Sequence, residues 1–163
     1  MNINNNNLVY RRLSNNDRDL FIKSRLDYIN ELHKDVDEAE KDKIKLSLEN
    51  YFQRQIKSNE FIGFICEYNG NIISVAYLVI SEWPANRTFI NGKIGTLLNV
   101  YTYPEYRKNG VATNVINKII EEAKKQNVSI INLMATEDGI NVYKKLGFIE
   151  TDNKSMRLKL QNI

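Results

Sequence analysis

The chain has 163 residues, 42% of them hydrophobic, which is typical of one soluble domain with a substantial core. The formal net charge of +3 is small, and acidic and basic residues are interspersed, which argues against the concentrated positive face of a nucleic-acid-binding protein. No apolar run approaches the roughly 20 residues that span a bilayer, and the single cysteine excludes an internal disulfide. We therefore expect a cytoplasmic protein that has neither nucleic acid nor membrane as a partner.

The N-terminal third predicts one strand and two helices. Residues 1–7 are polar and rich in asparagine, so we expect a frayed end, followed by one domain over residues 8–163. Leu8 to Leu13 is a candidate first strand. A helix should begin after Ser14–Asp17, whose residues are typical of turns and helix N-caps. A second helix is predicted from about Lys41 to Lys57, because its apolar residues recur on one helix face.

Two further strands are predicted as a hairpin. Phe61 to Tyr68 and Ile72 to Ile80 are rich in apolar and β-branched residues. The dipeptide Asn69-Gly70 between them is typical of a tight turn, since both residue types tolerate positive φ. We expect these strands to be antiparallel neighbours.

The stretch from Gly95 to Gln126 predicts a strand, a polar turn and a helix. Gly95 to Thr102 has the composition of a strand, whereas Tyr103 to Ala112 is mostly polar and contains a proline and a glycine. The apolar residues that then recur at helical spacing are Ala112, Val115, Ile116, Ile119, Ile120 and Ala123. The N–H groups of a first helical turn have no partner within the helix, and the positive end of the helix dipole lies there. The junction therefore predicts an anion site that suits a phosphate group.

The C-terminal part predicts three more strands and a short helix. Ile130 to Ala135 is a compact apolar run, typical of a buried strand. Asp138 to Leu146 is predicted as a helix with Gly147 as its C′ residue. Phe148 to Thr151 and Ser155 to Leu160 are the last predicted strands. The complete order, β-α-α-β-β-β-α-β-α-β-β, gives a mixed α/β (α+β) class: a mostly antiparallel sheet of six to seven strands, flanked on both faces by about four helices.

Two motifs in this setting resemble signatures of the GCN5-related N-acetyltransferase (GNAT) family. Arg107-Lys108-Asn109-Gly110-Val111-Ala112 matches the pattern (Arg or Gln)-x-x-Gly-x-(Gly or Ala) and lies between the predicted strand and helix. Tyr143-Lys144-Lys145-Leu146-Gly147-Phe148 follows the next strand, where the family carries its second signature. The order of elements is similar as well. The resemblance extends over nearly the whole chain, and it implies the GNAT fold.

The resemblance implies acetyl-CoA as cosubstrate. In this family, backbone amides of the loop and of the helix start hold the pyrophosphate, and the splayed edge of the preceding strand pairs with the pantetheine arm. Many relatives carry an asparagine seven residues before the tyrosine; here that residue is Thr136, and Asn141 is the asparagine nearest to the tyrosine. The cofactor-binding residues implied are Asn99, Val100, Tyr101, Thr102, Arg107, Lys108, Asn109, Gly110, Val111, Ala112, Thr113 and Asn141.

Acetyl transfer to an amine needs a proton donor for the departing thiolate and a base for the amine. By resemblance the donor is Tyr143. We assign the base to Glu82, which follows a strand that should lead to the substrate cleft. Water is an alternative, as are the titratable side chains Glu31, His33, Asp35, Asp37 and Glu105. One histidine and one cysteine cannot build a usual zinc site, so we expect no metal.

Two functions stay open at this point. The first is an acetyl-CoA-dependent N-acetyltransferase that acts on a primary amine of a small molecule or peptide, by direct attack in a ternary complex. The alternative is a non-catalytic CoA-binding sensor or regulatory module. A homodimer is common for this fold, but no feature of the sequence decides the oligomeric state.

Overall fold

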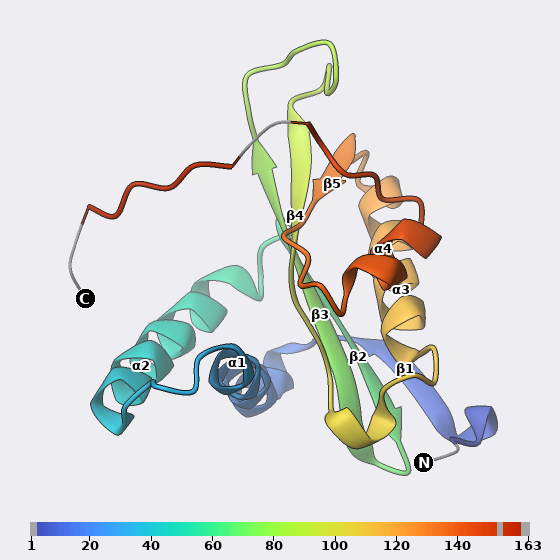
Figure 1. Ribbon diagram of the computed structural model, residues 1–163. Coiled ribbons are helices and arrows are strands. Elements are labelled where there is room, and N and C mark those ends of the chain that lie inside the picture. The colour runs from blue at the N-terminus through green and yellow to red at the C-terminus, as the bar shows by residue number, and fades with distance from the viewer. Residues whose placement is uncertain (1–2, 153–154, 161–163) are drawn as a thin grey trace.

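The computed structural model describes residues 3–152 and 155–160. In this part of the chain, one sheet has the strand order β1-β2-β3-β4-β5, and its strands are β1 (Leu8–Arg12), β2 (Phe61–Tyr68), β3 (Asn71–Glu82), β4 (Lys93–Thr102) and β5 (Ile130–Asn132). The α helices are α1 (Arg18–Leu32), α2 (Glu38–Gln55), α3 (Val111–Lys125) and α4 (Ile140–Lys145). Short 3-10 turns are η1 (Asn5–Asn7), η2 (Asn15–Asp17) and η3 (Pro104–Tyr106). Helices α1 and α2 cover one face of the sheet and α3 and α4 the other, which gives three layers (Figure 1).

The sheet is mixed and mostly antiparallel, as predicted. Strands β1 to β4 pair antiparallel in chain order, and β5 pairs with β4 in parallel, over Ile94–Thr96 and Ile130–Asn132. The hairpin of β2 and β3 is confirmed: Asn69 and Gly70 both have positive φ, at 50° and 79°, as a two-residue type I′ turn requires.

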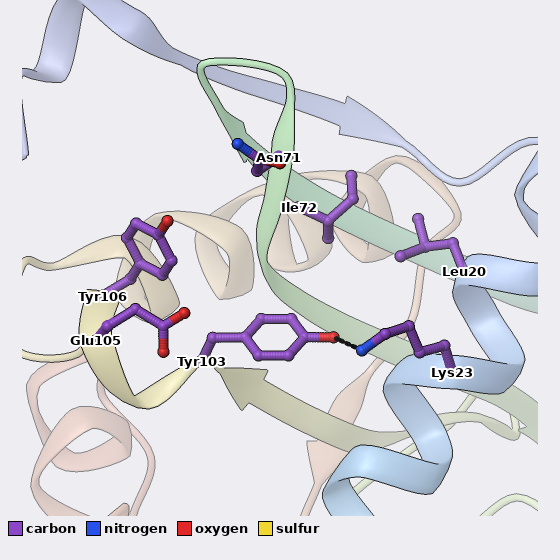
Figure 2. A pocket seen from close by; sticks show the side chains of 7 residues that line it. All are labelled: Leu20, Lys23, Asn71, Ile72, Tyr103, Glu105 and Tyr106. Carbon is purple, nitrogen blue, oxygen red and sulfur yellow. Dashed lines mark hydrogen bonds between the residues drawn. The ribbon is translucent and has the colours of Figure 1, made fainter.

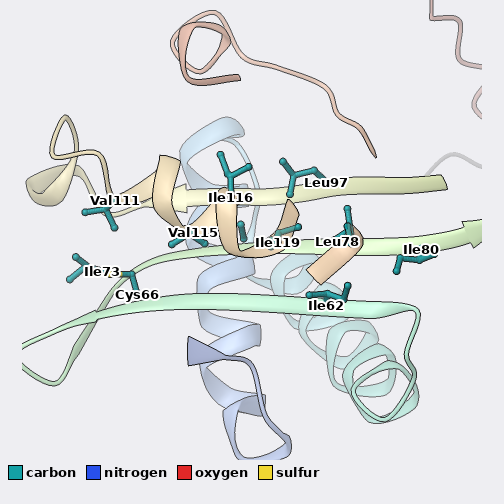
Figure 3. Close-up of a cluster of buried hydrophobic side chains, with 12 residues drawn as sticks. Ile62, Cys66, Ile73, Leu78, Ile80, Leu97, Val111, Val115, Ile116 and Ile119 are labelled. Carbon is teal, nitrogen blue, oxygen red and sulfur yellow. The ribbon is translucent and has the colours of Figure 1, made fainter. Parts of the chain in front are cut away.

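The core between the sheet and α3 is built from branched aliphatic side chains (Figure 3). Val115, Ile116 and Ile119 of α3 have no exposed surface, because the predicted apolar stripe of this helix faces the sheet. Cys66 of β2 lies in the same core, and burial raises the pKa of its thiol to about 11. Cys66 is therefore a structural residue, protonated at neutral pH.

The opposite face of the sheet is held by aromatic side chains. Phe21 of α1 lies at the centre, with ring centroids 5.1 Å from Tyr77 and 5.2 Å from Phe52. The hydroxyl groups of Ser24 and Tyr77 form a buried hydrogen bond of 2.6 Å. This bond satisfies both polar groups inside the core and fixes the position of α1 against β3.

The prediction of strands at Phe148–Thr151 and Ser155–Leu160 is wrong for the residues that the structure describes, and the sheet there has five strands instead of six to seven. Strand β5 is also shorter than the predicted Ile130–Ala135. The described part of residues 148–160 has no hydrogen-bonded neighbour strand, and it leads away from β5 (Figure 1). Alternation of apolar and basic residues in 155–160 predicted an extended chain, but alternation alone does not supply a partner strand.

Asp17 ties the start of α1 to the sheet. Its carboxylate accepts two hydrogen bonds of 2.8 Å from the guanidinium of Arg11, and two of 2.7 Å from the N–H and hydroxyl of Ser14. Arg11 also pairs with Glu67 of β2 at 2.6 Å. Burial of Asp17 opposes its charge, but these hydrogen bonds outweigh burial and lower the pKa of the carboxyl to about 2.

We expect Asp17 to make folding stability sensitive to acid. Its pKa is 3.8 without these contacts and about 2 in the folded chain, so its contribution is full above pH 4 and is lost as the pH falls toward 2. With allowance for the partial exposure of Arg11, that contribution is about 1 to 2 kcal/mol. The urea midpoint of unfolding should fall less between pH 4 and pH 2 in Asp17→Asn than in the wild type. In the control variant Asp19→Asn, which changes an exposed carboxylate, it should fall as much as in the wild type. Equal slopes in the two variants would contradict the assignment.

Candidate functional site

Strand β4 separates from β5 after a short pairing and contains a bulge. Beyond Ile94–Thr96, no described strand pairs with the β5 side of β4. On the β3 side the register shifts, so that Asn99 and Val100 lie opposite Ala76 alone. Asn99 has a φ of 50°, a left-handed conformation that asparagine tolerates better than most residues. The free backbone edge of β4 lies where we expect the pantetheine arm to bind.

The loop between η3 and α3 presents backbone N–H groups. Lys108 and Gly110 have φ values of 63° and 75°, and left-handed residues within such a loop turn successive N–H groups toward one side. The Asn109 amide donates to the carbonyls of Tyr106 and Arg107 and thereby closes the loop. No side chain caps α3, so its first-turn N–H groups are available to an anion. A Cβ atom on Gly110 would meet no atom within 4 Å, which shows that the loop is open there.

Arg107 has a structural contact that we did not predict. Its guanidinium donates to both carboxylate oxygens of Glu31 in α1, at 2.6 and 2.8 Å, and its Nε donates to the Thr102 carbonyl at 2.8 Å. The resemblance implies Arg107 as a cofactor-binding residue, but its positive charge is paired with the carboxylate of Glu31. The side chain instead joins the end of α1 to the end of β4.

Helix α4 ends at the predicted glycine. Gly147 has a φ of 89°, and its N–H donates to the Lys144 carbonyl at 3.1 Å. The N–H of Phe148 donates to the Tyr143 carbonyl, also at 3.1 Å. These two bonds form a Schellman motif, with Gly147 as the C′ residue. The motif turns the chain back, so that Phe148 packs beside the tyrosine.

Tyr143 is a partly buried phenol held by its neighbours. Its ring lies edge to face with Phe148, with centroids 5.8 Å apart, and its Cε2 lies so near Gly139 that an added Cβ would approach it to 3.3 Å. Burial, and then the nearby Tyr28, raise the pKa of Tyr143 to about 12. Its hydroxyl has no hydrogen-bond partner among the described residues. Tyr143 is thus a protonated donor at neutral pH.

Two other predicted side chains, Asn141 and Glu82, lie on different elements. Asn141 is on α4 and is exposed. Glu82 is the last residue of β3, exposed and opposite Lys93. From Lys93 to the bulge at Asn99 is six residues of β4, or roughly 20 Å at about 3.4 Å per residue. The structure therefore does not bring Glu82 to the bulge.

Helix α1 brings two side chains to the bulge that we did not predict as site residues. Arg25 donates to the Asn99 side-chain oxygen at 3.2 Å and lies over the ring of Tyr28. Tyr28 in turn lies edge to face with Tyr101. No local pattern could identify these residues, because their location depends on the packing of α1 against β4.

A cavity of about 360 Å³ lies beside η3 and the β2–β3 hairpin (Figure 2). On one wall, the Tyr103 hydroxyl donates to Asp27 at 2.6 Å and the Lys23 ammonium contacts both groups. The cavity is lined by Leu20, Lys23, Asn71, Ile72, Tyr103, Glu105 and Tyr106. A second groove, of about 580 Å³, lies between α1 and α2. Neither of these two cavities is lined by Tyr143. We therefore locate the candidate site by the unpaired backbone N–H groups of β4 and of the start of α3, and not by cavity volume.

The described residues contain no cluster of three or more His, Cys, Asp and Glu side chains placed to bind a metal ion. None of the helices in residues 3–152 has the length and apolar character that crossing a membrane requires.

Comparison with known proteins agrees with this geometry. Residues 26–148 match the acetyltransferase (GNAT) family. An uncharacterized N-acetyltransferase of Methanocaldococcus jannaschii is 31% identical over 106 residues, which are 63% of this chain and 45% of the relative. One from Pyropia yezoensis is 30% identical over 108 residues, 66% of this chain and 54% of the relative. The chain thus spans about half the length of these curated relatives.

Two solved structures share the whole architecture. A predicted acetyltransferase of Clostridium acetobutylicum, solved with acetyl-CoA, has 31% identity and a TM-score of 0.82, with 94% of this chain and 96% of that chain covered. A GCN5-related N-acetyltransferase of Ralstonia eutropha has 22% identity and a TM-score of 0.80, with 93% and 98% covered. The second likeness concerns the fold alone.

Proposed function

Because this chain belongs to the acetyltransferase (GNAT) family, we propose that it transfers an acetyl group from acetyl-CoA to a primary amine of a small molecule or peptide, by direct attack in a ternary complex. The observation that carries the proposal is the position of three features along β4. An uncapped helix start follows its end, a free backbone edge runs beside it, and the protonated Tyr143 of α4 packs against the core that contains Leu97 of this strand.

The residues present fit the cosubstrate. First-turn N–H groups of α3 and the open loop at Gly110 suit the pyrophosphate, because a helix start favours negative charge and the glycine leaves room for close approach. The free edge of β4 around Asn99 to Thr102 suits the amides of the pantetheine arm. The related Clostridium acetobutylicum structure, which holds acetyl-CoA, supports this assignment.

Acetyl-CoA supplies a thioester carbonyl that a neutral amine can attack. In the transfer, a C–N bond forms, the C–S bond breaks, and the amine loses a proton. A backbone N–H of β4 at the bulge stabilises the negative charge on the carbonyl oxygen. Tyr143 donates its phenolic proton to the departing sulfur. Glu82 is roughly 20 Å along the strand from the bulge, so we propose that water accepts the amine proton.

A broad panel of primary amines tests the function. We expect calorimetry to detect CoA binding, and we expect acetyl-CoA with at least one class of amine to release free CoA thiol. Absence of CoA binding to the folded protein would contradict the proposal. Binding without turnover across the panel would contradict transfer, and it is the result expected of a CoA-binding sensor.

A further inference from the structure

Arg25 is a half-buried cation beside the bulge of β4. Among the described residues, its guanidinium donates one hydrogen bond, to the side-chain oxygen of Asn99 at 3.2 Å, and it lies 5.6 Å from the ring centroid of Tyr28. None of the described carboxylates forms an ion pair with it. Arg11, which is also partly buried, differs because it is paired with Asp17 and Glu67. A partly buried guanidinium without a carboxylate partner has free N–H donors that can bind a negative group.

The groups around Arg25 do not supply that charge. The carboxylates of α1 are engaged elsewhere: Asp19 with Arg18, Asp27 with Lys23 and Tyr103, and Glu31 with Arg107. The two tyrosines that sense its charge, Tyr51 and Tyr77, are neutral, because burial raises the pKa of both. The described groups of this cluster therefore leave the guanidinium available to an anion from outside the protein.

Asn99 provides a second, independent indication. The residue is 3% exposed, and its Nδ2 is a buried donor without a partner in the described part of the chain. Arg25 fixes the orientation of this amide, since a guanidinium can donate to the amide oxygen and not to its NH₂ group. A buried donor without an acceptor is rare in folded proteins and points to a ligand oxygen.

We propose that the acetyl acceptor is an amino acid whose carboxylate binds to Arg25 and to Nδ2 of Asn99. Both groups are donors, they are joined by a hydrogen bond, and a carboxylate has enough lone pairs to accept from both. They lie at the bulge, where the acceptor meets the thioester according to the proposed function, on which this inference rests. In a small amino acid the amine is only a few bonds from the carboxylate, so binding here keeps the amine near the reacting carbonyl.

Matched acceptors test the inference. Each L-amino acid is compared with its own amide, which keeps the amine and the side chain but has no carboxylate. We expect the wild type to show a kcat/KM for the preferred acid, calculated per neutral amine, about 10- to 100-fold above that for its amide, since hydrogen bonds to a charged group are of that strength. Preference for the amide, or equal use of both, would overturn the inference. Absence of thiol release with every acid, amide and simple amine would instead count against the proposed function.

Variants separate binding of the carboxylate from a general structural role. Arg25→Gln should raise KM for the acid about tenfold or more and change kcat/KM for the amide by less than about threefold. Comparing the acid-to-amide ratio of the variant with that of the wild type cancels the difference between the pKa values of the two amines. The control Arg18→Gln, on the same helix and paired only with exposed Asp19, should leave the ratio unchanged. An equal loss for acid and amide in Arg25→Gln would contradict carboxylate binding.

Asn99→Asp provides a test that does not depend on loss of structure. Aspartate tolerates the positive φ at this position, and its carboxylate would supply the missing anion from within the protein. We expect this variant to unfold at a higher temperature than the wild type and to lose the preference for the acid. A lower unfolding temperature together with an unchanged preference would overturn the inference.

Discussion

Tyr143→Phe is expected to lower kcat for acetyl transfer by about 10²- to 10⁴-fold, the usual contribution of a positioned proton donor. Phenylalanine keeps the ring and its contact with Phe148, and it removes only the hydroxyl group. The hydroxyl is the group that we assign to the departing sulfur, and a thiolate that leaves without a proton is a poorer leaving group. CoA binding should change by less than about twofold, because the loop before α3 is untouched.

Steady-state thiol release and calorimetry measure these two quantities. The matched control is Tyr68→Phe, a partly buried tyrosine in β2 that packs against Tyr106. We expect that variant to keep its kcat. Because the pKa of Tyr143 is about 12, its proton should remain in place up to about pH 10, and ionisation of this group should not lower the wild-type rate below that pH. Equal turnover of Tyr143→Phe and wild type would remove the tyrosine from the mechanism.

Gly110→Ala is expected to weaken CoA binding by about tenfold or more. Gly110 has a φ of 75°, a conformation in which an L-residue is strained by about 1 to 2 kcal/mol. Alanine at this position therefore shifts the loop toward another conformation, in which the N–H groups of α3 no longer point to one place. The added Cβ would also project into the open space that we assign to the pyrophosphate.

Gly70→Ala controls for strain alone. Gly70 has a φ of 79°, and a Cβ there also meets no atom within 4 Å, but it lies in the β2–β3 hairpin and not at a helix start. The two substitutions should lower the urea midpoint by similar amounts, whereas only Gly110→Ala should raise the Kd for CoA. Equal CoA affinity in both variants would contradict the assignment of the loop.

Local signals in the sequence predicted local structure well. Asn69-Gly70 predicted the hairpin, Gly147 predicted the end of α4, and the apolar spacing from Ala112 predicted α3. In each case the residues that decide the conformation are neighbours in the chain. The free edge of β4 and the loop before α3 were predicted by resemblance, and the binding roles of their residues stay predictions.

Long-range features were not predictable in the same way. The last two strands were predicted wrongly, because an extended chain becomes a strand only beside a partner. The side chain of Arg107 lies against Glu31, a residue 76 positions away, and Arg25 meets Asn99 across 74 positions. Such contacts depend on how α1 docks on the sheet. The acceptor side that we propose depends on them, which is why the sequence indicated the cosubstrate but not the acceptor.

The burial of Cys66 determines how cleanly the reaction can be followed. A disulfide reagent that reports the thiol of released CoA also reacts with exposed protein thiols, but Cys66 has no exposed surface. Because the pKa of the Cys66 thiol is about 11, on the order of one protein molecule in 10⁴ carries the thiolate at pH 7. Folded protein should therefore add no background to the colour that develops. A variant that reacts with one equivalent of reagent per chain before acetyl-CoA is added has unfolded. The same assay therefore distinguishes a folded variant with slow turnover from an unfolded one.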